Sequence, residues 1–115
     1  MKMVVAYIQP FVVDKVVKAL QDIPEVPGAS FTEVRGFGRG RGQKDQESLA
    51  TEIAQAGTLR KTRLETMIPD QLEEKVVKTI RDAARTGMCG DGKIYVTSIQ
   101  RAVRIRTGQE GPEAL

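Results

Sequence analysis

The sequence has 115 residues, of which 40% are hydrophobic and 29% are charged, and its formal net charge is +3. This length provides for one domain with one core. The chain has no histidine and one cysteine, Cys89, which excludes the commonest general base, histidine-dependent nucleophiles, most zinc sites and an intrachain disulfide. No apolar run approaches the roughly 18 residues that a membrane span requires. We therefore expect a cytoplasmic protein that is not an enzyme and does not insert directly into a membrane.

The first part of the chain predicts a strand, a helix and a second strand. Residues 3–8 are apolar and partly β-branched, which is typical of a buried strand. Apolar residues recur at helical spacing between positions 13 and 20, so an amphipathic helix follows. Pro27-Gly28 then predicts a turn, and residues 29–36 predict a second strand.

A long polar connection comes next, from residue 38 to residue 59. It is rich in glycine, glutamine and charge, and its part 45–56 has moderate helix propensity. A connection of this length inside a compact domain is uncommon and is usually functional or disordered. We expect it to carry function.

The remaining chain predicts a strand at 62–68, a helix that ends near Arg85, and a strand at 94–99. Asp70 and Glu73 have the spacing of an N-terminal capping arrangement for that helix. Residues 103–106 are expected to form a last short strand.

The order strand, helix, strand, strand, helix, strand predicts an α+β fold, the ferredoxin-like βαββαβ sandwich. Such a fold has four antiparallel strands with both helices on one face. The other face of the sheet is then bare of helices, which favours an oligomer.

A glycine-rich segment, Gly87–Lys93, matches the first part of a phosphate-binding loop. Ile94 stands where a nucleotide-hydrolase loop needs a hydroxyl, and the segment leads from helix to strand instead of from strand to helix, so that function is rejected. Its glycines still let backbone N–H groups converge on an anion, and Lys93 adds a positive charge. The alternative is an ordinary helix-capping turn with a solvated lysine.

Two further segments have residues suited to an anion. Gly36–Gly42 combines glycines with two arginines, although a linker with solvated charges is the alternative. Arg104 and Arg106 would point to the same side of an extended segment as an anion clamp, although a charged edge strand is the alternative. Together the three segments favour an anionic ligand.

Two other groups of residues raise nucleic-acid binding and metal binding as alternatives. Tyr7, Phe31 and Tyr95 would suit base stacking, but the RNP1 pattern of RNA-binding ferredoxin-like domains is absent, so no nucleic acid is expected as a partner. Met88-Cys89 raises a soft-metal site, but one thioether and one thiolate are too few ligands. We assign no metal-binding residue and keep a metal-handling protein as an alternative hypothesis.

The sequence resembles the PII signal-transduction family, the nitrogen regulatory P-II proteins, nearly from end to end. The resemblance lies in four stretches that occur in the family's order: Tyr7–Phe11, Thr32–Arg39, Ala83–Val96 without positions 88 and 89, and Ala102–Gly108. It implies a homotrimer of ferredoxin-like subunits that holds ATP or ADP in the clefts between neighbours. It also implies a T-loop at about 38–59, a B-loop at about 86–93 and a C-terminal loop at about 104–115.

By position, the resemblance also implies the nucleotide-binding residues. Those near the adenine and ribose would be Ser30, Glu65 and Met67. Those at the T-loop base and in the B-loop, near the phosphates, would be Gly36, Phe37, Gly38, Arg39, Lys61, Gly90, Asp91, Gly92 and Lys93. Arg104 and Arg106 would come from the adjacent subunit. The T-loop would dock on a target protein, which is a transporter, an enzyme or a transcription regulator.

The sequence departs from the family in places. Gly40 stands where nitrogen-sensing members have a glutamine that helps hold Mg²⁺, which weakens the expectation that Mg²⁺ and 2-oxoglutarate bind. No tyrosine lies between residues 38 and 59, so uridylylation of a loop tyrosine is excluded, and Gln9 stands where a lysine is common. These departures favour a divergent PII-like regulator, and one associated with a metal efflux system or another transporter, without 2-oxoglutarate sensing, is the alternative.

Overall fold

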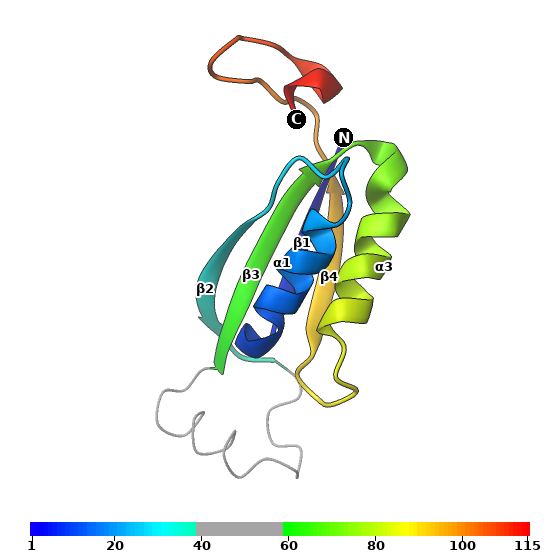
Figure 1. Cartoon of the computed structure of the whole chain (residues 1–115). Coiled ribbons are helices and arrows are strands. Elements are labelled where there is room, and N and C mark those ends of the chain that lie inside the picture. The colour runs from blue at the N-terminus through cyan, green and yellow to red at the C-terminus, as the bar shows by residue number, and fades with distance from the viewer. Residues whose placement is uncertain (39–58) are drawn as a thin grey trace.

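The computed structural model describes residues 1–38 and 59–115, and its elements follow the predicted order (Figure 1). The helices and strands are β1 (Lys2–Ile8), α1 (Val13–Gln21), β2 (Ser30–Gly36), β3 (Leu59–Ile68), α3 (Glu73–Ala84) and β4 (Gly92–Ser98). A short 3-10 turn precedes each of the two helices, and a third lies at Gly111–Ala114. Most of the predicted T-loop, including the segment 45–56, lies outside the described residues.

The strands form one four-stranded sheet in the order β2-β3-β1-β4. Each neighbouring pair is antiparallel, and β1 pairs along its whole length with β3 on one side and β4 on the other. Both helices lie on the same face of this sheet (Figure 1). The ferredoxin-like α+β fold is therefore confirmed.

The hydrophobic core lies between the helices and the sheet. In β1 the alternate residues Val4, Ala6 and Ile8 are at most 1% exposed, because this strand is central and its core side is covered by both helices. The buried stripes of the helices complete the core with Val16, Leu20, Val76, Ile80, Ala83 and Ala84. The intervening strand residues, such as Tyr7, Arg63 and Glu65, are only half-buried and lie on the face that the helices leave uncovered.

The predicted capping role of Asp70 is wrong. Its carboxylate accepts a hydrogen bond from the N-terminal ammonium of Met1 at 2.8 Å, and neither the 3-10 turn at Asp70–Leu72 nor α3 begins with a side-chain cap. The ion pair explains the difference, because an ammonium group is a stronger partner for a carboxylate than a backbone amide is.

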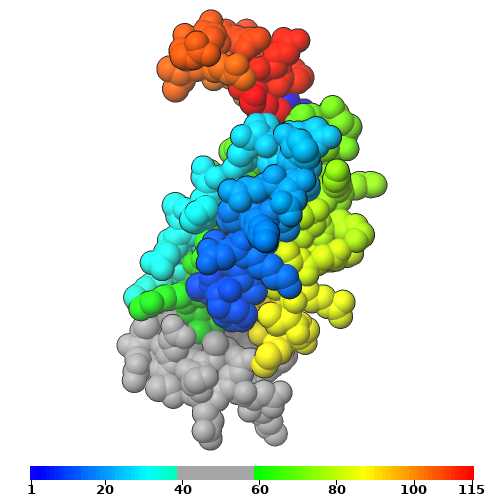
Figure 2. Space-filling view, in the orientation of Figure 1, coloured from blue at the N-terminus to red at the C-terminus, as the bar shows by residue number. Residues whose placement is uncertain are grey.

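The predicted last strand at 103–106 is also wrong. Val103 makes an isolated bridge to Glu110, and between them the chain turns back through hydrogen bonds from Gly108 N to Arg104 O and from Arg104 N to Gln109 O, both 2.8 Å long. The turn depends on Gly108, whose φ of 71° is readily accessible only to glycine. The C-terminal segment that contains this turn, coloured orange to red, projects from the rest of the molecule (Figure 2).

Candidate functional site

A pocket of about 540 Å³ lies at the end of the sheet where β1 and β2 end and β3 and β4 begin. Several of its lining residues were predicted from the sequence, namely Gly36, Phe37, Gly38, Lys61, Gly92 and Lys93. The other lining residues are Tyr7, Val34, Arg35, Leu59 and Tyr95. The charged residues of this lining, Arg35, Lys61 and Lys93, are all cationic, so the pocket suits an anion with an apolar or planar part.

The glycine-rich loop between α3 and β4 borders this pocket. Its glycines Gly87, Gly90 and Gly92 have φ values of 86°, 91° and 107°. Gly92 cannot be replaced without a shift of the backbone, since a Cβ there would lie 1.7 Å from the carbonyl oxygen of Tyr7. The local conformation of the loop therefore requires the glycines that suggested an anion site in the sequence.

The carboxylate of Asp91 closes this loop from within. It accepts hydrogen bonds from the backbone N–H of Thr86 at 2.8 Å, from the backbone N–H of Gly87 at 2.9 Å, and from the hydroxyl of Thr86. Desolvation opposes ionisation of Asp91, but the bonds from Thr86 and Gly87 and the charge of Lys61 outweigh it and lower the pKa of the carboxyl. The carboxylate is therefore engaged with residues of its own loop.

Lys61 reaches from β3 to the same loop, where its ammonium donates to the carbonyl oxygen of Gly90. Gln9 donates to the same oxygen through its side-chain amide, at 2.9 Å. Desolvation by burial lowers the pKa of Lys61, and the nearby charge of Asp91 opposes this effect. In contrast, Lys93 makes no side-chain hydrogen bond or ion pair with any residue in the described ranges, so its charge is available to a ligand.

The residues assigned to the adenine and ribose lie along the uncovered face of the sheet. Ser30 pairs directly with Glu65 across β2 and β3, and Met67 follows on the same face of β3. The Glu65 carboxylate forms an ion pair with Arg63 at 3.1 Å, and Arg63 donates to the hydroxyl of Tyr7 at 3.1 Å. The structure thus brings Ser30 and Glu65 together, and links Glu65 through Arg63 to Tyr7 at the pocket.

Arg104 and Arg106 are not brought to the glycine-rich loop by their own chain. The C-terminal segment lies at the opposite end of the sheet from the loop at 85–91 (Figure 1). The Arg104 guanidinium donates to the carbonyl oxygens of Glu113 and Leu115, at 3.1 and 3.0 Å. These arginines can reach such a loop only if it belongs to another chain.

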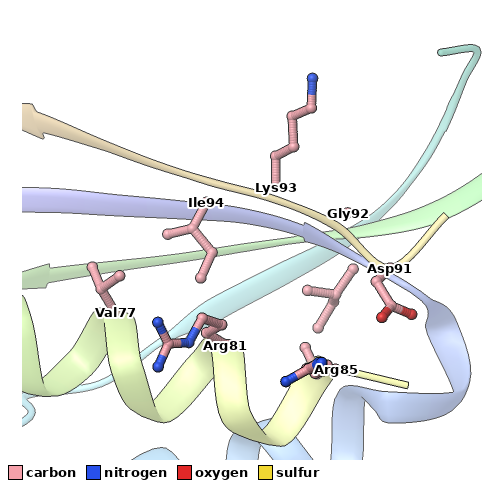
Figure 3. Close-up of a pocket in the computed structure, with 9 residues that line it drawn as sticks. Val77, Arg81, Arg85, Asp91, Gly92, Lys93 and Ile94 are labelled. Atoms are coloured by element: carbon pink, nitrogen blue, oxygen red, sulfur yellow. The ribbon is translucent and has the colours of Figure 1, made fainter. Parts of the chain in front are cut away.

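A second pocket, of about 350 Å³, lies between α3 and β4. Figure 3 shows Val77 and Ile94 facing each other across it, with Arg81 and Arg85 on the α3 side, while Lys93 points away from the helix. Asp91, Gly92 and Lys93 also line this pocket, so the start of β4 separates two hollows.

Some lining residues lie outside the set that the sequence predicts for the nucleotide. Arg35 and Arg85 lie inside the stretches that resemble the PII family. Tyr7 and Tyr95 have the alternation expected for the uncovered sheet face. The sequence therefore contained an indication for each of these four residues. Arg81 had no comparable signal. Arg39, a predicted phosphate-binding residue, and Gly40 lie outside the described residues.

The described ranges lack two kinds of structural feature. No helix there is long and apolar enough to cross a membrane. No group of three His, Cys, Asp or Glu side chains there could hold a metal ion, and both Met88 and Cys89 are exposed.

The fold and the pocket define a small ferredoxin-like α+β protein with a pocket at one end of its sheet whose charged lining residues are cationic. The family model for nitrogen regulatory protein P-II matches residues 1–109 of the chain. Curated proteins named nitrogen regulatory protein P-II from Rhizobium etli, Bradyrhizobium diazoefficiens and Haemophilus influenzae are 44%, 43% and 42% identical to it, over the full length of both chains in each case. The chain belongs to the P-II family of signalling regulators.

Proposed function

We propose that the chain is a signalling regulator without catalytic activity, and that it binds ATP or ADP between neighbouring chains of a homotrimer. The observation that carries this proposal is the pocket at the glycine-rich end of the sheet, whose charged lining residues are the cations Arg35, Lys61 and Lys93. A polyphosphate would balance these charges and accept hydrogen bonds from backbone N–H groups of the loop.

The position of the C-terminal arginines supports a site shared between chains. Arg104 and Arg106 belong to a segment at the far end of the sheet from the loop, so in this proposal a neighbouring chain supplies them to the phosphates. Ser30, Glu65 and Met67 would contact the adenine and ribose. The sheet face that the helices leave uncovered offers a surface for the chain-to-chain contact that this arrangement requires.

The output of the regulator would be the segment at 38–59, which we propose docks on a target protein in the cytoplasm. Gly38 and Leu59, at the two ends of this segment, both line the pocket. A nucleotide bound in the pocket would therefore contact both ends of the segment and favour some of its conformations over others. The target would be a transporter, an enzyme or a transcription regulator.

The test is calorimetric titration of the protein with ATP, ADP and adenosine. We expect heat with both nucleotides, and Lys93→Met should weaken ATP by roughly tenfold because it removes one charged phosphate contact. Lys15→Met, the same change at an exposed lysine of α1, should leave the affinity unaltered. Absence of heat with ATP and ADP up to millimolar concentration would refute nucleotide binding. Light scattering that gives a mass other than three times 12.6 kDa would refute the trimer.

A further inference from the structure

The carbonyl oxygen of Gly90 ties the glycine-rich loop to two strands at once. Gln9, directly after β1, donates to it at 2.9 Å, and Lys61 donates to it from β3. A carbonyl oxygen has two lone pairs, so it can accept both bonds together. The partners differ in one respect: Lys61 lines the 540 Å³ pocket, and Gln9 is not among its lining residues.

We propose that Gln9 is a positioning residue that orients the Gly90–Asp91 peptide group for anion binding. The peptide group is planar and trans, so its carbonyl oxygen and its N–H point in opposite directions. Fixing the Gly90 carbonyl toward Gln9 therefore fixes the direction of the Asp91 N–H, which points away from Gln9. Asp91 lines the second pocket, which shares Gly92 and Lys93 with the first. This inference rests on the proposed function, since it names how one chain prepares its loop for a phosphate.

Gln9 is well placed to hold the carbonyl when a ligand enters. An anion in the pocket would compete for the charged ammonium of Lys61, and it would attract the neutral amide of Gln9 less strongly. Gln9 then keeps the Gly90 carbonyl satisfied, and the orientation of the Asp91 N–H survives the movement of Lys61.

The backbone on both sides of this bond is fixed. Gln9 has φ −65° and ψ 140°, an extended conformation that the following Pro10 favours, and its own carbonyl accepts a bond from Val12 N at 3.2 Å. Gly90 has φ 91°, and a Cβ there would lie 2.9 Å from Nε2 of Gln9. The amide of Gln9 thus occupies the space that a larger residue at position 90 would need.

The test compares Gln9→Met, which keeps the length of the side chain but removes its donor, with Gln9→Lys, which keeps a donor. Gln71→Met, the same change at an exposed glutamine, is the matched control. In the nucleotide-free protein we expect Gln9→Met to shift the amide resonance of Asp91 in ¹⁵N spectra. We also expect it to weaken ATP by about three- to tenfold, and Gln9→Lys to reverse both changes. Gln71→Met should change neither.

A double variant sharpens the test. Each donor compensates in part for the loss of the other, so Gln9→Met combined with Lys61→Met should weaken ATP by more than the product of the two single effects. If the wild-type protein binds no nucleotide, the proposed function fails, and the Asp91 resonance still decides the inference. An unshifted Asp91 resonance in Gln9→Met, or ATP affinity equal to that of a wild-type protein that does bind ATP, would overturn it.

Discussion

The glycine-rich loop at 85–91 and the C-terminal turn at 103–110 look alike in the sequence and are built differently. Each contains at least one glycine of positive φ and at least one arginine. The loop is closed by Asp91 and tethered to two strands through the Gly90 carbonyl. The C-terminal turn is held mainly by hydrogen bonds within its own segment, and it leaves Ile105 99% exposed.

The difference teaches how each kind of anion site is made. Backbone N–H groups are oriented by the local fold, so a single chain can prepare them. Guanidinium groups on a projecting segment become a site only when a second surface lies opposite them. The exposed Ile105 between Arg104 and Arg106 fits a segment that contacts another chain, because a large apolar side chain gains from burial.

The largest expected effect comes from adding a methyl group at Gly92, where the loop joins β4, and at Gly108 in the C-terminal turn. Gly92→Ala places a Cβ 1.7 Å from the Tyr7 carbonyl oxygen, so it should cost about 3 kcal/mol or more of unfolding free energy. Gly108→Ala, in the C-terminal turn, has a similar backbone strain but no atom within 4 Å of the new Cβ, and should cost about 1 kcal/mol. Denaturant unfolding measures both, and equal losses would contradict the difference between the two regions.

The second prediction asks whether the C-terminal arginines serve a neighbouring chain. Arg104→Ala combined with Arg106→Ala should weaken ATP by about 100-fold, since two charged hydrogen bonds are lost, and should affect adenosine much less. Arg101→Ala, whose partner is Glu110 in the same segment, is the control and should bind ATP normally.

A mixing experiment tells whether the site spans two chains. Oligomers assembled from the double arginine variant and Lys93→Met should regain a minority of wild-type-like ATP sites, because some interfaces combine one intact loop with one intact pair of arginines. No recovery after mixing would show that the loop and the arginines do not meet across an interface.

The sequence predicted the elements that carry a periodic apolar signal. Val4, Ala6 and Ile8 alternate into the core as expected, and the stripes of α1 and α3 are buried at helical spacing. The third strand begins at 59 and not at the predicted 62, because the charged pair Arg60-Lys61 interrupts the apolar signal after Leu59.

Contacts between residues that are far apart in the chain could not be predicted from the sequence. Asp70 had the spacing of a helix cap, but its partner Met1 lies 69 positions away. Gln9 looked like a departure from a family pattern, and only the fold reveals that it bonds to Gly90, 81 positions away. The role of the loop glycines could be predicted because it depends on local backbone conformation. The positions of Gln9 and Arg81 relative to the loop and the second pocket depend on the packing of distant segments.

A third prediction concerns the closure of the loop by Asp91. Asp91→Asn removes the negative charge of the carboxylate that accepts hydrogen bonds from the Thr86 and Gly87 amides. These bonds should weaken and the loop should become less ordered, so ATP affinity should fall by roughly fivefold. Asp82→Asn, which removes the charge of an exposed aspartate paired with Lys78 on α3, should leave ATP affinity unchanged. Equal affinities of the two variants would mean that the closed loop is unnecessary for binding.

The smallest expected effect is on the titration of Asp91 itself. Its pKa is lowered from the ordinary value of 3.8, so the stability that the closed loop contributes is present above pH 3.8 and is lost as the pH falls through the lowered pKa. The charge of Lys61 is one cause of the lowering, so Lys61→Met should raise the pKa of Asp91 toward 3.8. The amide resonances of Thr86 and Gly87, which bond to the carboxylate, report the titration directly. An identical titration in the wild-type protein and Lys61→Met would show that Lys61 does not act on Asp91, whereas a shift confined to these amides would tie the pocket lysine to the closure of the loop.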